Sequence, residues 1–416
     1  MRLAVVGGSG ASTPELIDAL AAWPGGLDRR PSLNVVLQGR SADKLALVAD
    51  ACRRRLVPAT GGISVSSETD MDRALDGADV VLIQVRIGGL DARVFDETFP
   101  RAFGIPGEET QGPGGFANAM RTIPTLAATW DRIAARAPRA LVVNLTNPSG
   151  IVTAAMIHHA GLHAVSVCDA PVTFVEAISN ATGHAVADVR AAYVGMNHAG
   201  FWATPDSDSL AAAAATMGED AKDIAALGAM PTAYLRFYLH PDLQLSAQLA
   251  SKESRSQVLQ RLEAEMLGQY AGRVNPSAQS RRGAVWYGVS VVPLLDALVH
   301  GSDETFLLGL PNADAVPWAS PGAIIEIPTR VAAGGTFSRD HAADLPAPAA
   351  DLLARHAMYE TLTAEALAGA TDPRALAPRR DALVKALAAN PMVPTIGLAE
   401  RLVEVILAKS PGVNHR

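Results

Sequence analysis

The first twenty residues constrain the fold more than any other part of the chain. Residues 2–20 read RLAVVGGSGASTPELIDAL: a short apolar run, a glycine-rich turn and an amphipathic segment with a proline near its start. The apolar run suits a central parallel strand, and the proline suits the first turn of a helix. A strand, a glycine turn and a helix in this order are typical of dinucleotide binding. The residues expected to hold a dinucleotide are Gly8, Ser9, Gly10, Ser12 and Thr13.

Four further apolar runs extend this start into a larger sheet. They occupy residues 33–40, 78–86, 140–150 and 164–168, with plausible helices between them. Strands that alternate with helices at this spacing indicate βαβ units around a parallel sheet. We therefore predict an α/β fold, a Rossmann-like doubly wound parallel sheet, with a dinucleotide-binding domain over residues 1–165.

The pattern changes after residue 165. Residues 189–204 alternate as antiparallel strands do, and residues 242–271 and 349–409 have long helical patterns. We expect a mixed helical and antiparallel α+β second domain over residues 166–416.

Composition narrows the choice of partners and compartment. The formal net charge of −7 argues against nucleic-acid binding, which needs a basic stripe. No run of eighteen apolar residues suits a membrane span, and the N-terminal residues lack the pattern of a signal peptide. Two cysteines are too few for a disulfide framework, so a reducing, cytoplasmic location is expected.

The residues after the second strand bear on the choice of dinucleotide. NAD-preferring sites usually carry Asp or Glu there for the ribose 2′-hydroxyl, whereas this chain reads LQGRSADK. Arg40 and Ser41 could meet the 2′-phosphate of NADP, or Arg40 could stack on the adenine or lie in solvent. NAD is the expected cofactor, and NADP stays an alternative.

Residues 84–124 are rich in arginine, acidic residues and glycine. A core does not need this mixture, but a polar site at the carboxyl ends of parallel strands does. Arg86, Arg93 and Arg121 are candidates for binding an anionic group through charge-assisted hydrogen bonds. The alternative is that they pair with acidic neighbours, namely Asp91, Asp96, Glu97 or Glu108.

Cys168 stands at the end of the last apolar run, in SVCDAP, where three roles are open to it. It could be buried packing, a nucleophile or a metal ligand. His198 follows thirty residues later in GMNHAG, and a thiolate with a neutral imidazole suits a transition-type divalent ion. The spacing matches no zinc-finger pattern, so these residues alone leave both packing and metal binding open.

Several segments, taken together and in order, resemble family 4 of the glycoside hydrolases, and in particular its 6-phospho-β-glucosidase branch. The resemblance runs from residue 1 to about residue 330. The segments are VVGGSGASTPELIDAL, VRIGGLDARVFDE, PGEETQGPGGFANAMRTIP, NLTNPSGIV, CDAP, GMNHAGFW, YLRFYLHPD and RRGAVWYGVSVVPLLDAL. This NAD-dependent family is an exception to the two-carboxylate mechanism of glycoside hydrolysis. The resemblance implies a fold like that of lactate and malate dehydrogenases.

The resemblance implies a redox-assisted elimination on a 6-phosphorylated glucoside. NAD⁺ takes the hydride from C3 of the sugar, and the resulting ketone acidifies C2–H. A divalent metal, usually manganese, stabilises the enolate as a Lewis acid. Loss of the C2 proton expels the C1 substituent, water adds, and the hydride returns to C3.

The resemblance also assigns residues by position. Cys168 and His198 match the metal ligands, and Tyr234 matches the base at C2, with Tyr238 as the fallback. Asp169 would protonate the leaving oxygen or orient Cys168. The residues expected to hold the sugar and its phosphate are Arg93 and Arg282, then Arg86, with Asn147 and Asn197, although Asn147 could also simply form a turn. The second domain would then carry metal, substrate and oligomer contacts.

Asp169 departs from the 6-phospho-β-glucosidase branch, whose members typically have asparagine after the cysteine. Some phospho-α-glucosidases have aspartate there, so 6-phospho-α-glucosides are an alternative substrate. Uronides or sulfosugar glycosides are others, if the arginines hold a different anion. The family also implies a homodimer or homotetramer, while residues 331–416 carry no readable chemistry.

Two competing functions belong to other classes. A NAD(P)-dependent 2-hydroxy acid dehydrogenase would share the fold but need no metal thiolate. A nucleotide-sensing protein would keep the glycine turn and need neither Tyr234 nor the pair of Cys168 and His198.

Overall fold

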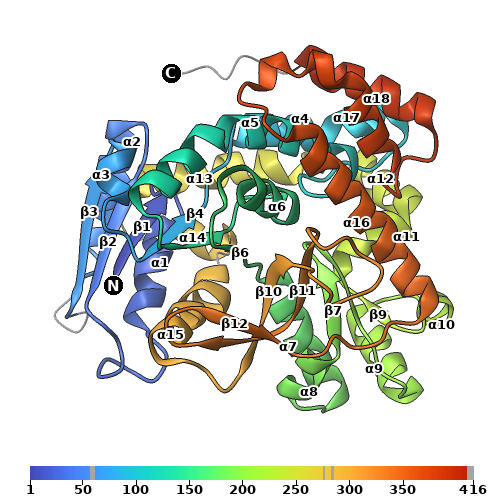
Figure 1. Ribbon diagram of the computed structural model, residues 1–416, viewed down its shortest axis with the longest axis horizontal. Coiled ribbons are helices and arrows are strands. Elements are labelled where there is room, and N and C mark those ends of the chain that lie inside the picture. The colour runs from blue at the N-terminus through green and yellow to red at the C-terminus, as the bar shows by residue number, and fades with distance from the viewer. Residues whose placement is uncertain (57–60, 275–276, 283–284, 410–416) are drawn as a thin grey trace.

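The first half of the chain forms a parallel sheet with helices on both faces (Figure 1). The computed structural model describes residues 1–56, 61–274, 277–282 and 285–409. The strands of this half are β1 (Arg2–Val6), β2 (Leu33–Gln38), β3 (Ile63–Glu68), β4 (Val80–Ile83), β5 (Leu141–Asn144) and β6 (Ala164–Ser166). Their order is β3-β2-β1-β4-β5-β6, and each neighbouring pair is parallel. This is the strand order of a Rossmann sheet, so the predicted fold is confirmed.

Antiparallel strands from the second half continue the same sheet (Figure 1). They are β7 (Tyr193–Met196), β8 (Ala199–Trp202), β9 (Met230–Pro231), β10 (Thr305–Pro311), β11 (Ile324–Ala332) and β12 (Thr336–Arg339). Strand β10 joins the edge of β6, and β11, β7, β8 and β9 follow outward, while β12 pairs with β11. The β7–β8 hairpin confirms the antiparallel pairing predicted for residues 189–204. Because one sheet runs through both predicted domains, the boundary at residue 165 stays a prediction.

Helices fill the connections and cover the sheet. Those of the first half are α1 (Thr13–Ala21), α2 (Ala42–Arg53), α3 (Met71–Leu75), α4 (Gly89–Thr98), α5 (Gly112–Arg136), α6 (Ser149–Ala160) and α7 (Ala170–Thr182). Those that follow are α8 (Val186–Ala191), α9 (Ser207–Met217), α10 (Ala221–Leu227), α11 (Arg236–Leu239), α12 (Pro241–Ala250), α13 (Arg255–Ala271), α14 (Ser277–Arg282), α15 (Val292–His300), α16 (Ala347–Leu367), α17 (Arg380–Ala388) and α18 (Ile396–Lys409). Short 3₁₀ turns lie at Phe99–Phe103, Ala233–Leu235, Pro373–Ala375 and Ala377–Arg379, and a π-helical turn lies at Tyr287–Val291.

The two long helical patterns are each divided. The predicted stretch 242–271 becomes α12 and α13, because Ser254 begins a new helix through a capping box with Gln257. The stretch 349–409 becomes three helices, α16 to α18, with prolines in the turns that separate the first two. Among the described residues, no helix is both long and apolar enough to cross a membrane.

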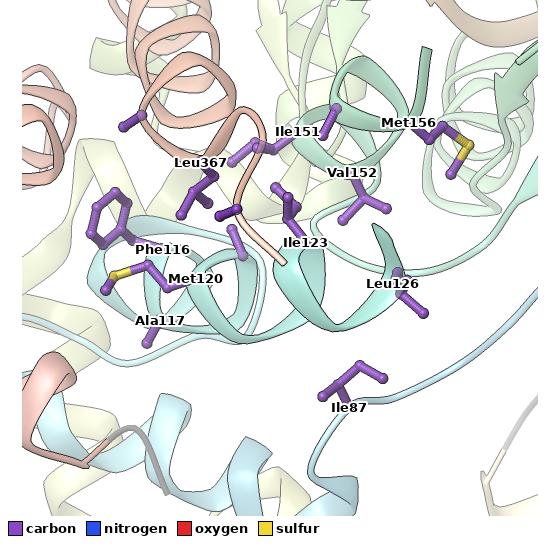
Figure 2. Close-up of a cluster of buried hydrophobic side chains, with 14 of the residues drawn as sticks. Ile87, Phe116, Ala117, Met120, Ile123, Leu126, Ile151, Val152, Met156 and Leu367 are labelled. Atoms are coloured by element: carbon purple, nitrogen blue, oxygen red, sulfur yellow. The ribbon is translucent and has the colours of Figure 1, made fainter. Parts of the chain in front are cut away.

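Both faces of the parallel sheet are buried. In β1, Ala4 and Val6 face one core, while Leu3 and Val5 face the other, as the two-residue period of a strand requires. Helices α1, α2 and α15 cover the second face. Helices α5 and α6 cover the first, and the C-terminal helices α16 to α18 add an outer layer over them (Figure 1). Figure 2 shows this packing at Phe116, Met120 and Ile123 of α5, Ile151 and Val152 of α6, and Leu367 of α16.

The start of α5 packs against the chain before it with no room for side chains. A Cβ atom at Gly114 would lie 2.1 Å from the Glu108 carbonyl oxygen, and one at Gly115 would lie 2.0 Å from the Thr110 carbonyl oxygen. These glycines therefore let the start of α5 pack directly against the backbone at Glu108 and Thr110.

We expect Gly115→Ala to lower the free energy of unfolding by about 1–3 kcal/mol, because the added methyl group must displace backbone. Gly268→Ala is the matched control, since Gly268 also lies in a helix and nothing approaches its Cβ position within 4 Å. That substitution should raise the free energy of unfolding by up to about 1 kcal/mol. Urea unfolding of both variants measures the difference, and equal effects would contradict the packing argument.

Candidate functional site

The predicted site residues gather where the parallel strands end at their carboxyl edge. The glycine turn follows β1, Arg40 follows β2, Arg86 follows β4 and Asn147 follows β5. Cys168 follows β6, the last parallel strand. Ligands bind at this edge in open α/β sheets, because loops diverge there and leave room between them.

The glycine turn lies close against β2 and β4. Gly7 has a φ of 88°, a value that favours glycine, and a Cβ atom there would lie 2.8 Å from the Gln84 carbonyl oxygen. A Cβ atom at Gly8 would lie 2.8 Å from Cα of Leu37. The tight turn brings the backbone to the N-terminus of α1, where N–H groups and the helix dipole favour an anion.

Ser12 supplies the observation that favours a ligand at this turn. It stands at the N-cap of α1 and is only 5% exposed, yet its side chain caps no backbone group and its Oγ has no hydrogen-bond partner. Buried polar atoms are seldom left unpaired in a folded chain. The pyrophosphate of a dinucleotide would supply the missing partner, so the predicted residues fit this group.

Two further residues line the turn and were not predicted from the sequence. The Gln84 amide donates to Thr13 Oγ1 at 3.0 Å and accepts from the Tyr287 hydroxyl at 2.7 Å. The only sequence signal for Gln84 is a polar residue directly after the apolar strand. Gly39, after β2, lies close against the turn, since a Cβ atom there would lie 3.0 Å from Cβ and Oγ of Ser9.

Arg40 is exposed beyond β2, so its side chain is free to meet a ligand. The neighbouring Ser41 caps α2, where its hydroxyl accepts a hydrogen bond from the Lys44 backbone at 3.3 Å. The Ser41 hydroxyl is therefore already used to cap α2. Arg40 is then the residue that would bind the 2′-phosphate by which NADP differs from NAD.

Cys168 is poorly suited to act as a free nucleophile. Burial, followed by the charges of Glu326 and Asp169, raises the pKa of the Cys168 thiol well above its ordinary value. Its backbone carbonyl accepts a hydrogen bond from Ser290, and its Sγ lies 3.9 Å from Asp169 Oδ1. A protonated thiol does not attack, but a metal ion can displace its proton, so metal binding is favoured over nucleophilic attack.

Asp169 stands at the N-cap of α7 without capping it through its side chain. Burial raises the pKa of the Asp169 carboxyl above its ordinary value. A carboxyl that keeps its proton to higher pH is suited to donate that proton.

His198 lies with Asn197 in the two-residue turn between β7 and β8, and its φ is 61°. It is 7% exposed, and burial lowers the pKa of its imidazole to about 4. Its Nδ1 is buried and has no hydrogen-bond partner. A neutral imidazole with a free ring nitrogen has the chemistry of a metal ligand.

Tyr234 lies against His198 and near enough to Cys168 to interact with it electrostatically. Its ring stacks on that of His198, with centroids 3.9 Å apart and planes 11° from parallel. Burial raises the pKa of Tyr234, and nearby carboxylates and Cys168 raise it further. The described residues contain no group of three or more His, Cys, Asp or Glu that could hold a metal ion. A metal on Cys168 and His198 would therefore take its remaining ligands from substrate and water.

Asparagine side chains and Gln111 fix the turn that carries His198. The backbone N–H of Ser149 donates to Asn197 Oδ1 at 3.0 Å. The Gln111 amide donates to the His198 carbonyl at 3.1 Å, and Gln111 is fully buried. The Asn147 carbonyl accepts from Asn118 at 3.1 Å, so its backbone is fixed beside this network. Gln111 and Asn118 were not predicted.

Two of the predicted arginines share one carboxylate that the sequence did not single out. Glu109 pairs with Arg86 and, at 2.7 Å, with Arg93, which also pairs with Glu97 at 2.7 Å. Burial would raise the pKa of the Glu109 carboxyl, but the two guanidinium groups outweigh burial and lower it. Arg121 is held by Asp96 at 2.6 Å. Arg86, Arg93 and Arg121 therefore each pair with an acidic side chain of the protein, which is the second of the two alternatives that the sequence left open.

Arg282, at the end of α14, differs from these three. It forms no ion pair with any described carboxylate, and its NH1 is buried without a hydrogen-bond partner. Its guanidinium lies 5.3 Å from the centre of the Trp286 ring. Burial lowers the pKa of the Arg282 guanidinium; among its neighbours, Tyr287 and Glu15 raise this pKa and Arg86 lowers it. Arg282 therefore offers an unpaired cation near the start of α1.

Family models cover most of the chain. One described as family 4 glycosyl hydrolase matches residues 2–184, and one described as the C-terminal domain of that family matches residues 193–393. A 6-phospho-beta-glucosidase of Thermotoga maritima is 27% identical over 98% of this chain and 98% of its own.

Solved structures share the whole fold. One of the 6-phospho-beta-glucosidase from Thermotoga maritima with NAD and glucose-6-phosphate has a TM-score of 0.84 at 24% identity, covering 98% of each chain. A 6-phospho-alpha-glucosidase from gut microorganisms, with NAD and glucose-6-phosphate, has a TM-score of 0.83 at 21% identity, covering 98% of this chain and 97% of its own. A lactate dehydrogenase of Trichomonas vaginalis has a TM-score of 0.52 at 12% identity over 88% of this chain and 98% of its own, as the fold prediction implied. Since the two family models span both halves, the chain belongs to family 4 of the glycoside hydrolases.

Proposed function

We propose that this glycoside hydrolase acts on 6-phosphorylated glucosides, and first of all on 6-phospho-β-glucosides. The observation that carries the proposal is the neutral His198, with its free Nδ1, stacked on Tyr234 beside Cys168. A dehydrogenase needs no metal thiolate, and a nucleotide sensor needs none of the three residues. Two of the relatives named above are a 6-phospho-beta-glucosidase and a 6-phospho-alpha-glucosidase, which supports the substrate class.

NAD⁺ and a divalent ion, Mn²⁺ in the first place, are the groups we propose at the two fitted sites. At the glycine turn, with Ser12 as partner, NAD⁺ would supply a hydride acceptor for C3 of the sugar. On Cys168 and His198, the metal would act as a Lewis acid toward the oxygens of C2 and C3. NADP⁺ remains an alternative through Arg40.

The chain's own residues would handle protons and orientation. Tyr234 would take the proton from C2, once the charge of the metal has lowered the pKa that burial raises. Asp169 would donate a proton to the oxygen that leaves C1, since its raised pKa favours the protonated form. Asn147 and Asn197 would orient the sugar hydroxyls near the turn.

Arg282 is our first choice for the 6-phosphate. Arg93 and Arg86 share Glu109, so their charge is largely balanced, whereas Arg282 has a buried N–H group without a partner. An unpaired guanidinium and a phosphate oxygen satisfy one another. Arg93 and Arg86 would then position the Glu109 carboxylate and add to the positive electrostatic potential of the site. The anion could instead be a carboxylate or sulfonate, as in a uronide or sulfosugar glycoside.

The test uses metal-depleted protein with aryl α- and β-glucoside 6-phosphates in D₂O. Release of the aryl group is followed with and without Mn²⁺, and with NAD⁺ or NADP⁺. We expect release that needs both additions, deuterium at C2 of the product and no net NADH. Release without any nucleotide would refute the mechanism, and accumulating NADH would favour the dehydrogenase. Cleavage of the α-anomer alone would reassign the substrate in the way that Asp169 suggests.

We also propose a homodimer or homotetramer in the cytoplasm. The family relationship supports the assembly, and the small number of cysteines supports a reducing compartment. Sedimentation of the purified chain measures the assembly directly.

A further inference from the structure

Helix α16 places two titratable side chains in the interior of a region for which the sequence predicted no chemistry. His356 is 2% exposed and Glu360 is 5% exposed. Leucine at either position would pack without the cost of burying a polar group, so each polar side chain needs a partner. Tyr238, the hydrogen-bond partner of His356, leads to the turn that carries His198.

A chain of hydrogen bonds connects His356 to this turn. Gln111 Nε2 donates to the carbonyl oxygens of His198 at 3.1 Å and Asn197 at 3.4 Å, so Gln111 Oε1 must be an acceptor. The Tyr238 hydroxyl donates to that oxygen. Because its one hydrogen is then used, the Tyr238 oxygen accepts from His356 Nδ1, 3.2 Å away. Each bond fixes the direction of the next.

Glu360 lies against His356 and the N-terminus of α6 without adding a hydrogen bond to this chain, since His356 Nε2 and Glu360 Oε2 are both buried without a hydrogen-bond partner. Its Oε1 lies 3.4 Å from His356 Nε2. Its Oε2 occupies the space that a Cβ atom of Gly150 would need, at a distance of 2.4 Å. Gly150 is the second residue of α6, where the helix dipole favours a carboxylate. The backbone N–H of Ser149, the first residue of α6, donates to Asn197 Oδ1.

Hydrogen bonds hold the Asn197–His198 turn from two sides, and α16 reaches one of them, Gln111, through His356 and Tyr238. Gln111 holds the two carbonyl oxygens of the turn, and the start of α6 holds the Asn197 side chain. The turn needs this support because His198 has a φ of 61°, a backbone conformation that is unfavourable for a residue other than glycine. Such a backbone persists only where the surroundings fix it.

We propose that His356 is a positioning residue that, through Tyr238 and Gln111, holds His198 in its metal-binding orientation and so sets the affinity for the metal. The inference rests on the proposed function in one respect, the assignment of His198 as a metal ligand. Groups that orient a metal ligand typically change metal affinity by about 10- to 100-fold when removed.

The experiment measures Mn²⁺ binding to the full chain without substrate, by the EPR signal of the free ion. His356→Leu removes both ring nitrogens and should weaken Mn²⁺ binding by about tenfold. His356→Asn keeps a donor at the place of Nδ1 and should recover most of that loss. Tyr238→Phe removes one hydroxyl, breaks the same chain of bonds and should also weaken binding.

A control on the same helix separates positioning from stability. Leu367 is fully buried at the C-terminal end of α16, eleven residues beyond His356, so Leu367→Ala should lower Tm and leave Mn²⁺ affinity unchanged. Equal Mn²⁺ affinity in wild type, His356→Leu and Tyr238→Phe would overturn the inference, whatever their Tm values.

Aryl glucoside 6-phosphate cleavage by the wild type is measured in parallel. Wild type that binds Mn²⁺ but cleaves no aryl glucoside 6-phosphate would overturn the proposed function. If the variants still ranked in the expected order of Mn²⁺ affinity, the positioning role would nevertheless be supported.

Discussion

Cys168→Ser is expected to lower kcat/KM for an aryl glucoside 6-phosphate by about a thousandfold or more, since Lewis-acid stabilisation is worth several kcal/mol. A serine hydroxyl is a hard, weakly acidic ligand and does not replace a thiolate on a transition-type ion. The substitution should also abolish the proton release that accompanies Mn²⁺ binding. The wild type must lose that proton, because burial and the neighbouring acids keep the thiol protonated before the metal arrives. Initial rates and the pH change on adding Mn²⁺ measure both effects.

The second cysteine of the chain provides the control. Cys52 is fully buried in α2, within the core that packs α1 and α2 on the sheet, and lies apart from Cys168. Cys52→Ser should lower the free energy of unfolding and leave the rate and the proton release close to those of the wild type. Full activity in Cys168→Ser would contradict the assignment of Cys168 as a metal ligand.

The parallel half of the fold could be predicted because its strands are buried on both faces and appear as continuous apolar runs. Strand β3 was missed for the same reason. Its sequence, ISVSSE, alternates, and its burial pattern alternates as well, because it lies at the edge of the sheet. The antiparallel strands β10 to β12 also went unassigned. Their place beside β6 depends on contacts between segments far apart in the chain, which no local pattern encodes.

The residues of the candidate site also divide into those that a local sequence pattern could predict and those that it could not. The glycine turn, CDAP and GMNH could be found because each is a short motif with its own chemistry. Three other residues could not be found in this way: Gln111, Glu109 and His356. Each acts through a partner that lies more than twenty residues away in the sequence. The sequence of the glycine-rich segment gives no reason to single out Gln111. Its role follows only from its hydrogen bonds to the turn that carries His198.

The arginines are the clearest example of what the sequence alone could not predict, namely which charged side chains pair with one another. The sequence identified a segment with too many charges for a core, but it could not say which charges cancel. In the structure, Glu109 balances two arginines and Asp96 a third, while Arg282 keeps an unpaired buried N–H group. Charge count predicted a polar site, and only tertiary pairing identifies the cation that is free to hold an anion.

Tyr234→Phe is expected to lower kcat by about 10²- to 10⁴-fold, the usual contribution of a positioned base. Phenylalanine keeps the ring that stacks on His198, so Mn²⁺ affinity and KM should change little. Exchange of the C2 hydrogen with D₂O should disappear with the hydroxyl. Because burial raises the pKa of Tyr234, its deprotonation should contribute to the pH dependence of wild-type kcat, together with the loss of the Asp169 proton. The residual rate of the variant should lack the contribution of Tyr234. NMR of the product in D₂O and a pH–rate profile provide the measurements.

Tyr359→Phe is the matched control for this prediction, because it also removes a buried hydroxyl. That hydroxyl meets the Gly112 carbonyl at 3.5 Å, within the core under α16 rather than at the proposed reacting carbon. The control should keep both C2 exchange and the pH dependence. If Tyr234→Phe kept them too, the base would have to be another residue. Tyr238, the fallback from the sequence, is already bound to Gln111 and His356, so its proton is committed to the network that holds the turn. Tyr234 instead stacks on His198, and its proton is not used in that network. Loss of Tyr234 should therefore stop the transfer of the C2 proton.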